Sequence, residues 1–489
     1  MLAFDNSYAR LPEHFYARLA PTPVAAPRLL KLNVALAEAL GLDARALATD
    51  EGVALLAGNM VPGSAEPIAM AYAGHQFGNF VPELGDGRAI LLGEIIAPGG
   101  ARRDVQLKGS GPTPFSRRGD GRAALGPVLR EYIVAEAMAA LAIPTTRALA
   151  AVATGEKVLR EGYLPGAVLT RIAASHIRVG TFQYFAVRGD IASVRALVDY
   201  VVARHYPAAA EAARPALALL EAVALGQAEL VARWMHVGFI HGVMNTDNMS
   251  IAGETIDYGP CAFMDAYHPA TVYSSIDHMG RYAFANQPRI AQWNLARLAE
   301  ALLPLLADVE EEAVEVAEAA LATFAARFRQ TYVAGLRRKL GLVEERPEDG
   351  ALAEDLLRRM AEGGADYTLT FRRLADAAAS TAADSELRAL FTDPAAYDSW
   401  AVGWRERMAA EGGPGPARQA AMRAVNPLYI PRNHLVEAAI RAAVEHDDLG
   451  PFETLVEVSG RPFEAQAGRE RHAAPPRPEE VVEQTFCGT

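Results

Sequence analysis

The chain has 489 residues, of which 51% are hydrophobic and 22% charged, a composition typical of a globular protein with roughly two to four packing units. Its net charge of -12 argues against a nucleic-acid partner, because such proteins usually carry a basic surface that neutralises phosphates. Two cysteines are too few for a disulfide scaffold, and charged residues and Pro215 interrupt the longest apolar stretch, so we expect a cytoplasmic protein with no membrane partner. We also expect a monomer.

The first third of the chain predicts a mixture of helices and strands. Leu and Ala periodicity predicts a helix over residues 26–47, and a region rich in Gly and Pro follows from Gly58 to Gly87. Strands are predicted over Ala89–Ile96 and Asp104–Lys108, on either side of a Pro-Gly-Gly turn. A long helix with one apolar face is expected from about Gly121 to Leu141.

Beyond Thr170 the pattern becomes mainly helical. A strand–loop–strand segment interrupts it from Phe239 to Asp257, with Met249–Ile251 as its second strand. Helices are predicted over residues 216–237, 293–340 and 351–445. A strand-rich first part followed by a helical second part is an α+β fold class, with a ligand expected between the two parts.

Two short motifs in the strand-rich part could contact phosphates. Gly85 and Gly87 would let backbone N–H groups approach a phosphate and Arg88 adds positive charge, although a simple hairpin turn is the alternative. Lys108 ends a predicted strand, and because burying an unpaired ammonium is costly we expect Glu131, on the following helix, to pair with it. Protein kinases place a strand lysine and a helix glutamate in this order to grip phosphates, whereas a solvated edge lysine is the alternative here.

The segment His241-Gly242-Val243-Met244-Asn245-Thr246-Asp247-Asn248 has the spacing of a kinase catalytic loop, in which His-Arg-Asp precedes four residues and Asn. Val243 stands where kinases have the catalytic aspartate, and a valine cannot accept a proton. Asp247 is the available replacement carboxylate, and Asn248 occupies the metal-ligand position. A polar turn would also explain Asn-Thr-Asp-Asn, but it would not explain the apolar residues on both sides.

Ile256-Asp257-Tyr258-Gly259 is a variant of the kinase Asp-Phe-Gly signature, whose aspartate binds a metal ion. The oxygens of Asp257 and Asn248 suit a hard cation such as Mg²⁺ or Mn²⁺. Arg171 and Arg178 are seven residues apart, which on a helix would place them on one face. They could form a second phosphate grip facing Lys108, and a solvated surface is the alternative.

Together these motifs resemble the selenoprotein O family of protein adenylyltransferases, and the resemblance runs from Asn6 to the tail. The segments that carry it are Ala73-Gly74-His75-Gln76-Phe77-Gly78, Gly85-Asp86-Gly87-Arg88, Lys108-Gly109-Ser110-Gly111, His241–Asn248, Ile256-Asp257-Tyr258-Gly259-Pro260, Gly280-Arg281-Tyr282, Asn286-Gln287-Pro288, Trp293-Asn294-Leu295, Asn426-Pro427 and Arg432-Asn433.

The resemblance implies a pseudokinase with a two-lobed, protein-kinase-like fold. ATP would lie flipped relative to a kinase, so that AMP is moved onto Ser, Thr or Tyr hydroxyls of proteins and pyrophosphate is released. Asp247 would be the proton acceptor, Asn248 and Asp257 the metal ligands, and Glu131 would orient Lys108. The implied ATP contacts are Gly85, Gly87, Arg88, Lys108, Asp120, Gly121, Arg171, Arg178 and Asp257.

The same resemblance divides the chain into residues 1–165 (N-terminal extension and N-lobe), 166–345 (C-lobe), 346–470 (helical extension) and 471–489 (a flexible tail). Cys487 in the tail stands where some relatives have selenocysteine, and a regulatory Cys261–Cys487 disulfide is a hypothesis. Three other functions stay open: uridylyl transfer from UTP, a small-molecule phosphotransferase of the aminoglycoside-kinase type, and a nucleotide-binding scaffold without activity. Val243 argues against the phosphotransferase.

Overall fold

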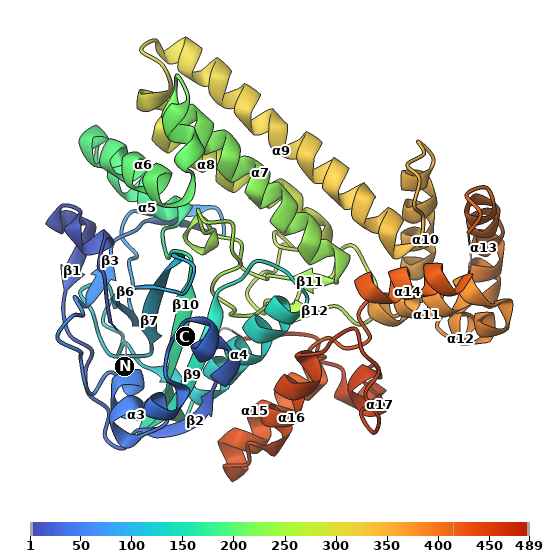
Figure 1. The fold of residues 1–489 in the computed structure, drawn as a ribbon, viewed down its shortest axis with the longest axis horizontal. Helices are drawn as coiled ribbons and strands as arrows, with labels where there is room; N and C mark the ends of the chain where they lie inside the picture. The colour runs from blue at the N-terminus through green and yellow to red at the C-terminus, as the bar shows by residue number, and fades with distance from the viewer. Residues whose placement is uncertain (1–2, 414, 487–489) are drawn as a thin grey trace.

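The computed structural model describes residues 3–413 and 415–486, and an antiparallel sheet of eight strands lies at one end of it (Figure 1). The strand order is β1-β3-β6-β7-β10-β9-β2, and β8 pairs with β10. The strands are β1 (Tyr16–Arg18), β2 (Arg28–Leu32), β3 (Ile68–Met70), β6 (Ala89–Ile96), β7 (Arg102–Lys108), β8 (Ala123–Ala124), β9 (Arg147–Leu159) and β10 (Tyr163–Ala173). Two small hairpins, β4–β5 (Gly74–Gln76 and Asn79–Val81) and β11–β12 (Phe239–Ile240 and Ala262–Phe263), lie outside it.

The structure confirms both predicted strands of the first part. β6 and β7 are neighbours, and Ala89 pairs with Lys108 at the end of the ladder. Every β6 residue except Ile96 is buried, because helices or loops cover both faces of the sheet there. The sequence patterns did not identify the long hairpin β9–β10, which places Leu169 opposite Lys108.

The helix predicted over residues 26–47 is wrong. Residues Arg28–Leu32 form β2, the edge strand that pairs with β9. Asn33 ends the strand and caps the short helix α1 (Val34–Ala39) by accepting a hydrogen bond from the backbone N–H of Leu36. A second short helix, α2 (Ala44–Leu47), follows Gly41, whose φ of 73° ends the first. Pairing at the sheet edge therefore outweighs the helix propensity of the Leu and Ala residues.

Helices make up most of the remainder, as predicted. They are α3 (Asp50–Ala57), α4 (Leu125–Ala140), α5 (Val179–Ala186), α6 (Ile191–His205), α7 (Pro215–His236), α8 (Gln287–Leu306), α9 (Glu310–Lys339), α10 (Asp349–Gly363), α11 (Tyr367–Ala379), α12 (Asp384–Arg388), α13 (Pro394–Ala409), α14 (Gly415–Val425), α15 (Asn433–His446), α16 (Gly450–Ser459) and α17 (Glu470–Ala473). α7, α8 and α9 pack together, and α4 lies between the sheet and the pair α15–α16 (Figure 1). The fold is thus mixed α/β around an antiparallel sheet.

Within the part of the chain that the structure describes, one helix, α7, is long and apolar enough by length and composition to cross a membrane, so the sequence-based exclusion of such a segment is wrong on that criterion. Its apolar residues, including Leu220, Val231 and Trp234, are buried in the largest hydrophobic core. Contacts with α8 and α9 account for this burial, as in the core helix of a globular protein.

A buried ion cluster ties the C-terminal helices to the segment after β12. Arg432 has no exposed side-chain surface, and its Nη1 lies 2.5 Å from Asp366 Oδ2 and 2.6 Å from Asp265 Oδ1. Its Nη2 donates a 2.9 Å hydrogen bond to the carbonyl oxygen of Ala473. One arginine therefore joins the segment just after β12, the N-cap of α11 and the last residue of α17.

Replacing Arg432 with alanine is expected to lower the free energy of unfolding by about 3–5 kcal/mol, because it leaves two carboxylates buried without their cation. Urea unfolding followed by circular dichroism measures this. The matched control is Arg388→Ala, which removes an exposed partner of Asp398 and should cost no more than about 1 kcal/mol. Equal losses in the two variants would contradict the importance assigned to the buried cluster.

Candidate active site

Three cations from different elements converge on the carboxylate of Asp257. Arg171 Nη1, from β10, lies 2.9 Å from Asp257 Oδ1, and Lys108 Nζ, at the end of β7, lies 3.6 Å from the same oxygen. Arg178, directly before α5, hydrogen-bonds to Asp257 Oδ2 through its Nη1. Asp257 has a φ of 60°, a conformation that few residues other than Gly, Asn and Asp adopt. Its side chain still exposes 20% of its surface, so a ligand can reach this cluster.

Glu131 holds two of these cations in place. Lys108 Nζ lies 2.5 Å from Glu131 Oε2, and Arg171 Nε lies 3.0 Å from Glu131 Oε1. Glu131 is buried on α4, and the pairing with Lys108 predicted from the sequence is confirmed. Burial alone would raise the pKa of Asp257, but Arg178, Arg171 and Lys108 outweigh it and hold the pKa well below its usual range.

Asp247 lies beside this cluster and is covered by the hairpin β4–β5. Arg178 Nη1 donates a 2.6 Å hydrogen bond to the main-chain oxygen of Asp247, which leaves the carboxylate out of that interaction. Gln76 Nε2 lies 3.4 Å from Asp247 Oδ2. Gly74 leaves room for the carboxylate, because a Cβ at that position would lie 2.3 Å from Asp247 Oδ1. Burial raises the pKa of Asp247 to about 6, although Arg178 opposes the shift.

Asn248 follows Asp247 in a short 3₁₀ turn, and its Nδ2 donates a 2.9 Å hydrogen bond to the carbonyl oxygen of Val243. The amide oxygen is thereby left as an acceptor on the other side of the group. His241 is buried and its Nε2 lies 2.8 Å from the carbonyl oxygen of Ile256, so the ring links the loop to the segment that carries Asp257.

The strand predicted at Met249–Ile251 is wrong. β11 pairs instead with β12, and only Ser250 makes an isolated bridge, to Arg178. Met249 and Ile251 are buried, so their apolar character anchors a loop in the core and does not indicate a ladder. This bridge brings Arg178 itself against the segment that follows Asn248.

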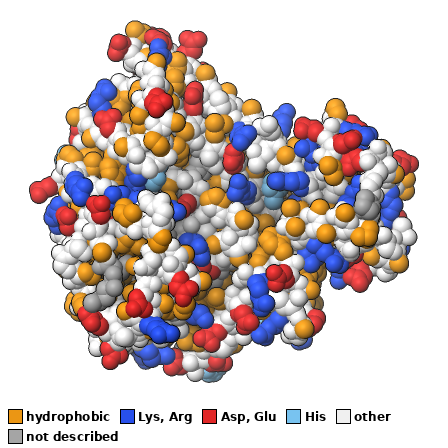
Figure 2. Space-filling view, viewed as in Figure 1, with side chains coloured by type: hydrophobic (Ala, Val, Ile, Leu, Met, Phe, Trp, Pro, Cys, Tyr) orange, Lys and Arg blue, Asp and Glu red, His pale blue; other side chains and the backbone are white. Residues whose placement is uncertain are grey.

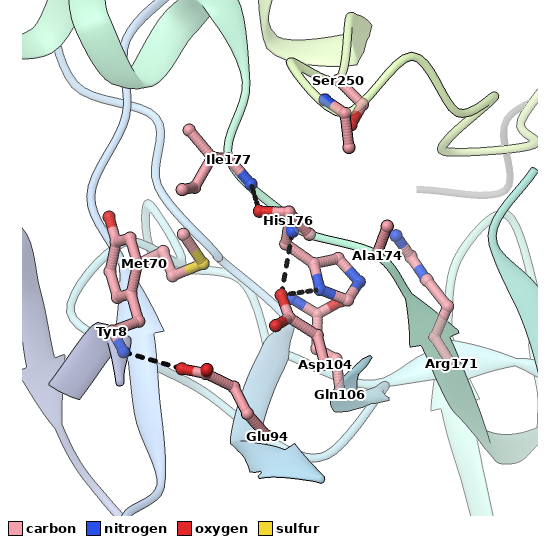
Figure 3. Close-up of polar contacts among 12 residues, drawn as sticks. Tyr8, Met70, Glu94, Asp104, Gln106, Arg171, Ala174, His176, Ile177 and Ser250 are labelled. Atoms are coloured by element: carbon pink, nitrogen blue, oxygen red, sulfur yellow. Dashed lines mark hydrogen bonds and ion pairs between the residues drawn. The ribbon is translucent and has the colours of Figure 1, made fainter. Parts of the chain in front are cut away.

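The helical placement of Arg171 and Arg178 is also wrong. Arg171 lies inside β10, and a bend directly after β10 separates it from Arg178. Asp104 of β7 fixes this bend by accepting a hydrogen bond from the backbone N–H of His176. The backbone N–H and Nδ1 of His176 both contact Asp104 Oδ2 at 2.9 Å, as Figure 3 shows. Arg204 of α6 contacts Asp104 Oδ1 at 2.6 Å. The guanidinium groups of Arg171 and Arg178 both contact the carboxylate of Asp257, because the bend after β10 turns Arg178 toward it.

The remaining predicted contacts lie around this centre. Arg88 lines a small pocket of about 20 Å³ together with Lys108, Glu131, Tyr258 and Phe486. Gly85 and Gly87 pack against Phe115, whose ring or main chain a Cβ at either position would meet. Gly121 has a φ of 64° and lies against the main chain of Gly111. Asp120 forms an ion pair with Arg160, at 2.9 Å, and Arg160 is not one of the cations around Asp257.

Sequence reasoning missed Asp86 and Gln76 as members of the site. Asp86 is buried, accepts a hydrogen bond from the backbone of Met70, and has Oδ1 3.8 Å from Arg178 Nη2. Its position between Gly85 and Gly87 is the available signal, although the sequence patterns assign roles only to these glycines and to Arg88. Gln76 had no signal beyond its place in the segment 73–78, because its contact with Asp247 crosses the fold.

The tail and the cysteines are only partly described. Cys261 is buried, whereas Cys487 lies outside the described residues, so the disulfide stays a hypothesis. Thr485 Oγ1 donates a 2.6 Å hydrogen bond to the carbonyl oxygen of Pro260, one residue before Cys261.

Comparison with known proteins gives the family. A model of the family described as "Protein adenylyltransferase SelO" matches residues 1–460. The chain belongs to the SelO family. It is 67% identical over 486 residues to the protein nucleotidyltransferase YdiU of Rhodopseudomonas palustris strain BisB5, and 66% identical to the protein of that name from Bradyrhizobium diazoefficiens, in both cases over 99% of each chain. The SelO resemblance and the enzyme class expected from the sequence, a nucleotidyltransferase, are thereby confirmed.

Proposed function

We propose that this chain transfers AMP from ATP to Ser, Thr or Tyr hydroxyls of proteins and releases pyrophosphate. The observation that carries the proposal is the convergence of Lys108, Arg171 and Arg178 on Asp257, with Asp247 held beside them by the same Arg178. A triphosphate needs several fixed cations, and nucleotidyl transfer asks a protein mainly for positioning and charge neutralisation. The names of the SelO family and of the YdiU relatives support the same reaction.

In this proposal the chain adopts a two-lobed, kinase-like arrangement with ATP flipped between the lobes. Arg171 and Arg178 grip the outer phosphates together with Lys108, and Glu131 orients the lysine. The other ATP contacts are Gly85, Gly87, Arg88, Asp120, Gly121 and Asp257. The division at residues 165, 345 and 470 belongs to this proposal, and β10 (Tyr163–Ala173) crosses the first of these boundaries. A monomer in the cytoplasm is the setting we propose.

Asp247 accepts the proton in the proposed reaction. The acceptor hydroxyl oxygen forms a bond to the α-phosphorus, the bond from that phosphorus to the pyrophosphate oxygen breaks, and the hydroxyl proton passes to Asp247 Oδ1. This oxygen is buried and has no hydrogen-bond partner among residues 3–413 and 415–486, so its lone pairs are available for that proton. Lys108 and the two arginines neutralise the charge that moves onto the leaving pyrophosphate.

The donor set fits a divalent metal ion of the hard type. Asp257 offers a carboxylate oxygen and Asn248 an amide oxygen, and both are ligand types that Mg²⁺ and Mn²⁺ accept. The part of the chain that the structure describes contains no cluster of three or more His, Cys, Asp or Glu residues that could hold a metal. Such a sparse set matches Mg²⁺, which usually takes one or two protein oxygens and completes its shell with phosphate and water. When bound, the ion would neutralise phosphate charge.

Of the other nucleotide-using functions that the sequence left open, uridylyl transfer is the one that fits the family. UTP could replace ATP, since none of the contacts described here reads the base. A small-molecule phosphotransferase would need a carboxylate at position 243, where the chain has Val243. The family match argues against that reading and against a scaffold without activity.

The products distinguish these functions. Incubation with ATP, Mg²⁺ or Mn²⁺ and an unfolded acceptor protein is expected to release pyrophosphate and to yield acceptor that carries AMP, which chromatography and intact-mass measurement detect. Release of ADP together with a phosphorylated acceptor would instead indicate a phosphotransferase. Parallel reactions with UTP test the base preference.

A further inference from the structure

Arg281 is a cation that stands beside the proposed acceptor side of the site without a carboxylate partner. Its Cζ lies 4.7 Å from the centre of the Trp293 ring and 5.7 Å from that of Tyr282. Among the described residues, Arg281 makes no ion pair, and its Nε is buried with no hydrogen-bond partner. The Arg281 side chain also interacts with the Tyr282 hydroxyl. A guanidinium that lies on an aromatic face still has further N–H groups in its plane that a carboxylate can accept from.

The position of Arg281 is fixed by its backbone. The carboxylate of Asp277 accepts hydrogen bonds from the backbone N–H groups of Arg281, at 2.9 Å, and Tyr282, at 2.8 Å. Asp277 is buried, and both of its oxygens are engaged in this way. Asp277 therefore holds this loop through two backbone N–H groups, and its carboxylate does not pair with the guanidinium of Arg281.

Asn245 and the hairpin β4–β5 connect Arg281 to Asp247. The Tyr282 hydroxyl donates a 2.6 Å hydrogen bond to Asn245 Oδ1, which also accepts one from the backbone of Phe77 at 3.0 Å. Gln76, the preceding residue, contacts Asp247, and the guanidinium of Arg281 lies 3.6 Å from where a Cβ on Gly78 would be. The cation thus lies along the same exposed hairpin that covers the proposed base.

A second arginine on the same tryptophan differs in one respect. Arg297 Cζ lies 4.8 Å from the Trp293 ring, but its guanidinium pairs with Glu300. Both arginines therefore stack on one ring, and only Arg297 already has a carboxylate. The overall surface mixes acidic and basic side chains, as the face in Figure 2 shows, and the chain carries a net charge of -12.

We propose that Arg281, stacked on Trp293, binds a carboxylate of the acceptor protein, so that hydroxyls with a neighbouring Asp or Glu are modified preferentially. The inference rests on the proposed transfer to proteins and adds the class of acceptor. A bidentate pair of guanidinium and carboxylate supplies both energy and orientation. The pair would hold the acceptor segment along the hairpin while its hydroxyl reaches Asp247.

The test uses two synthetic peptides of one length, with a single tyrosine flanked by Glu in one and by Gln in the other. With α-labelled ATP, the wild-type protein is expected to modify the Glu peptide with a kcat/KM about tenfold higher, the effect of one partly exposed charge-assisted hydrogen bond. Arg281→Gln should bring the two peptides to equal values and leave the KM for ATP unchanged. Arg281→Lys should keep part of the preference, because lysine retains the charge but not the planar fork.

Arg297→Gln is the matched control and should keep the full preference. Fluorescence anisotropy of labelled peptides measures binding without transfer, so it separates the two proposals. Equal binding of both peptides to the wild-type protein, or a preference that survives in Arg281→Gln, would overturn the carboxylate site. Selective binding without any transfer of label would leave the carboxylate site standing as a binding site and refute the proposed function.

Discussion

Replacing Asp257 with asparagine is expected to reduce nucleotide transfer by at least about a hundredfold to a thousandfold, and to remove metal-dependent ATP binding. A group that stabilises developing charge is typically worth this much in rate. Asparagine has nearly the same shape and tolerates the φ of 60°, so the substitution removes mainly the negative charge. Lys108, Arg171 and Arg178 would then face each other without the carboxylate that balances them. Transfer is measured with labelled ATP, and binding by calorimetry with and without Mg²⁺.

The control for this substitution is Asp376→Asn. Asp376 on α11 also accepts hydrogen bonds from an arginine, Arg423, but lies outside the site and should not affect transfer. Thermal unfolding of both variants shows whether a loss of activity reflects a loss of fold. A folded Asp257→Asn protein with wild-type transfer would refute the role given to Asp257.

Replacing Asp247 with asparagine should lower kcat by about 10²–10⁴-fold, the usual contribution of a general base. The KM for ATP should change little, because Arg178 binds the main-chain oxygen of Asp247 and not its carboxylate. Asparagine also preserves the volume beside Gly74, where space is limited. Steady-state kinetics with varied ATP and a fixed acceptor protein separate the two parameters.

A rise in the KM for ATP with an unchanged kcat would show that Asp247 acts in nucleotide binding. Wild-type values for both parameters would show that the base assignment is wrong. The two aspartates therefore differ in their expected signatures: loss of binding and transfer for Asp257, loss of transfer alone for Asp247.

Local spacing was sufficient to predict several parts of the site. Lys108 at the end of a strand and Glu131 on the next helix form an ion pair because β7 and α4 are placed by strong hydrophobic patterns. The apolar β6 and β7 segments were likewise identified as strands from β propensity and the turn between them. These features depend on short stretches of sequence.

The parts that could not be predicted depend on contacts between distant segments. The spacing of Arg171 and Arg178 suggested a helix. Arg171 instead lies in β10, because that strand pairs with β7 and β9. Gln76 reaches Asp247 across 171 positions of the chain. β2 likewise forms from a helix-favouring segment because β9 offers it an edge. Tertiary pairing of this kind outweighs local propensity.

Two parallel reactions, one with α-labelled ATP and one with γ-labelled ATP, test the central claim most directly. Each contains the purified protein, a divalent metal ion and an unfolded acceptor protein, and the label on the acceptor is counted after precipitation. If the acceptor hydroxyl attacks the α-phosphorus of ATP, only the α label reaches the acceptor and the γ label leaves with pyrophosphate. Label from the γ position on the acceptor, without label from the α position, would contradict it.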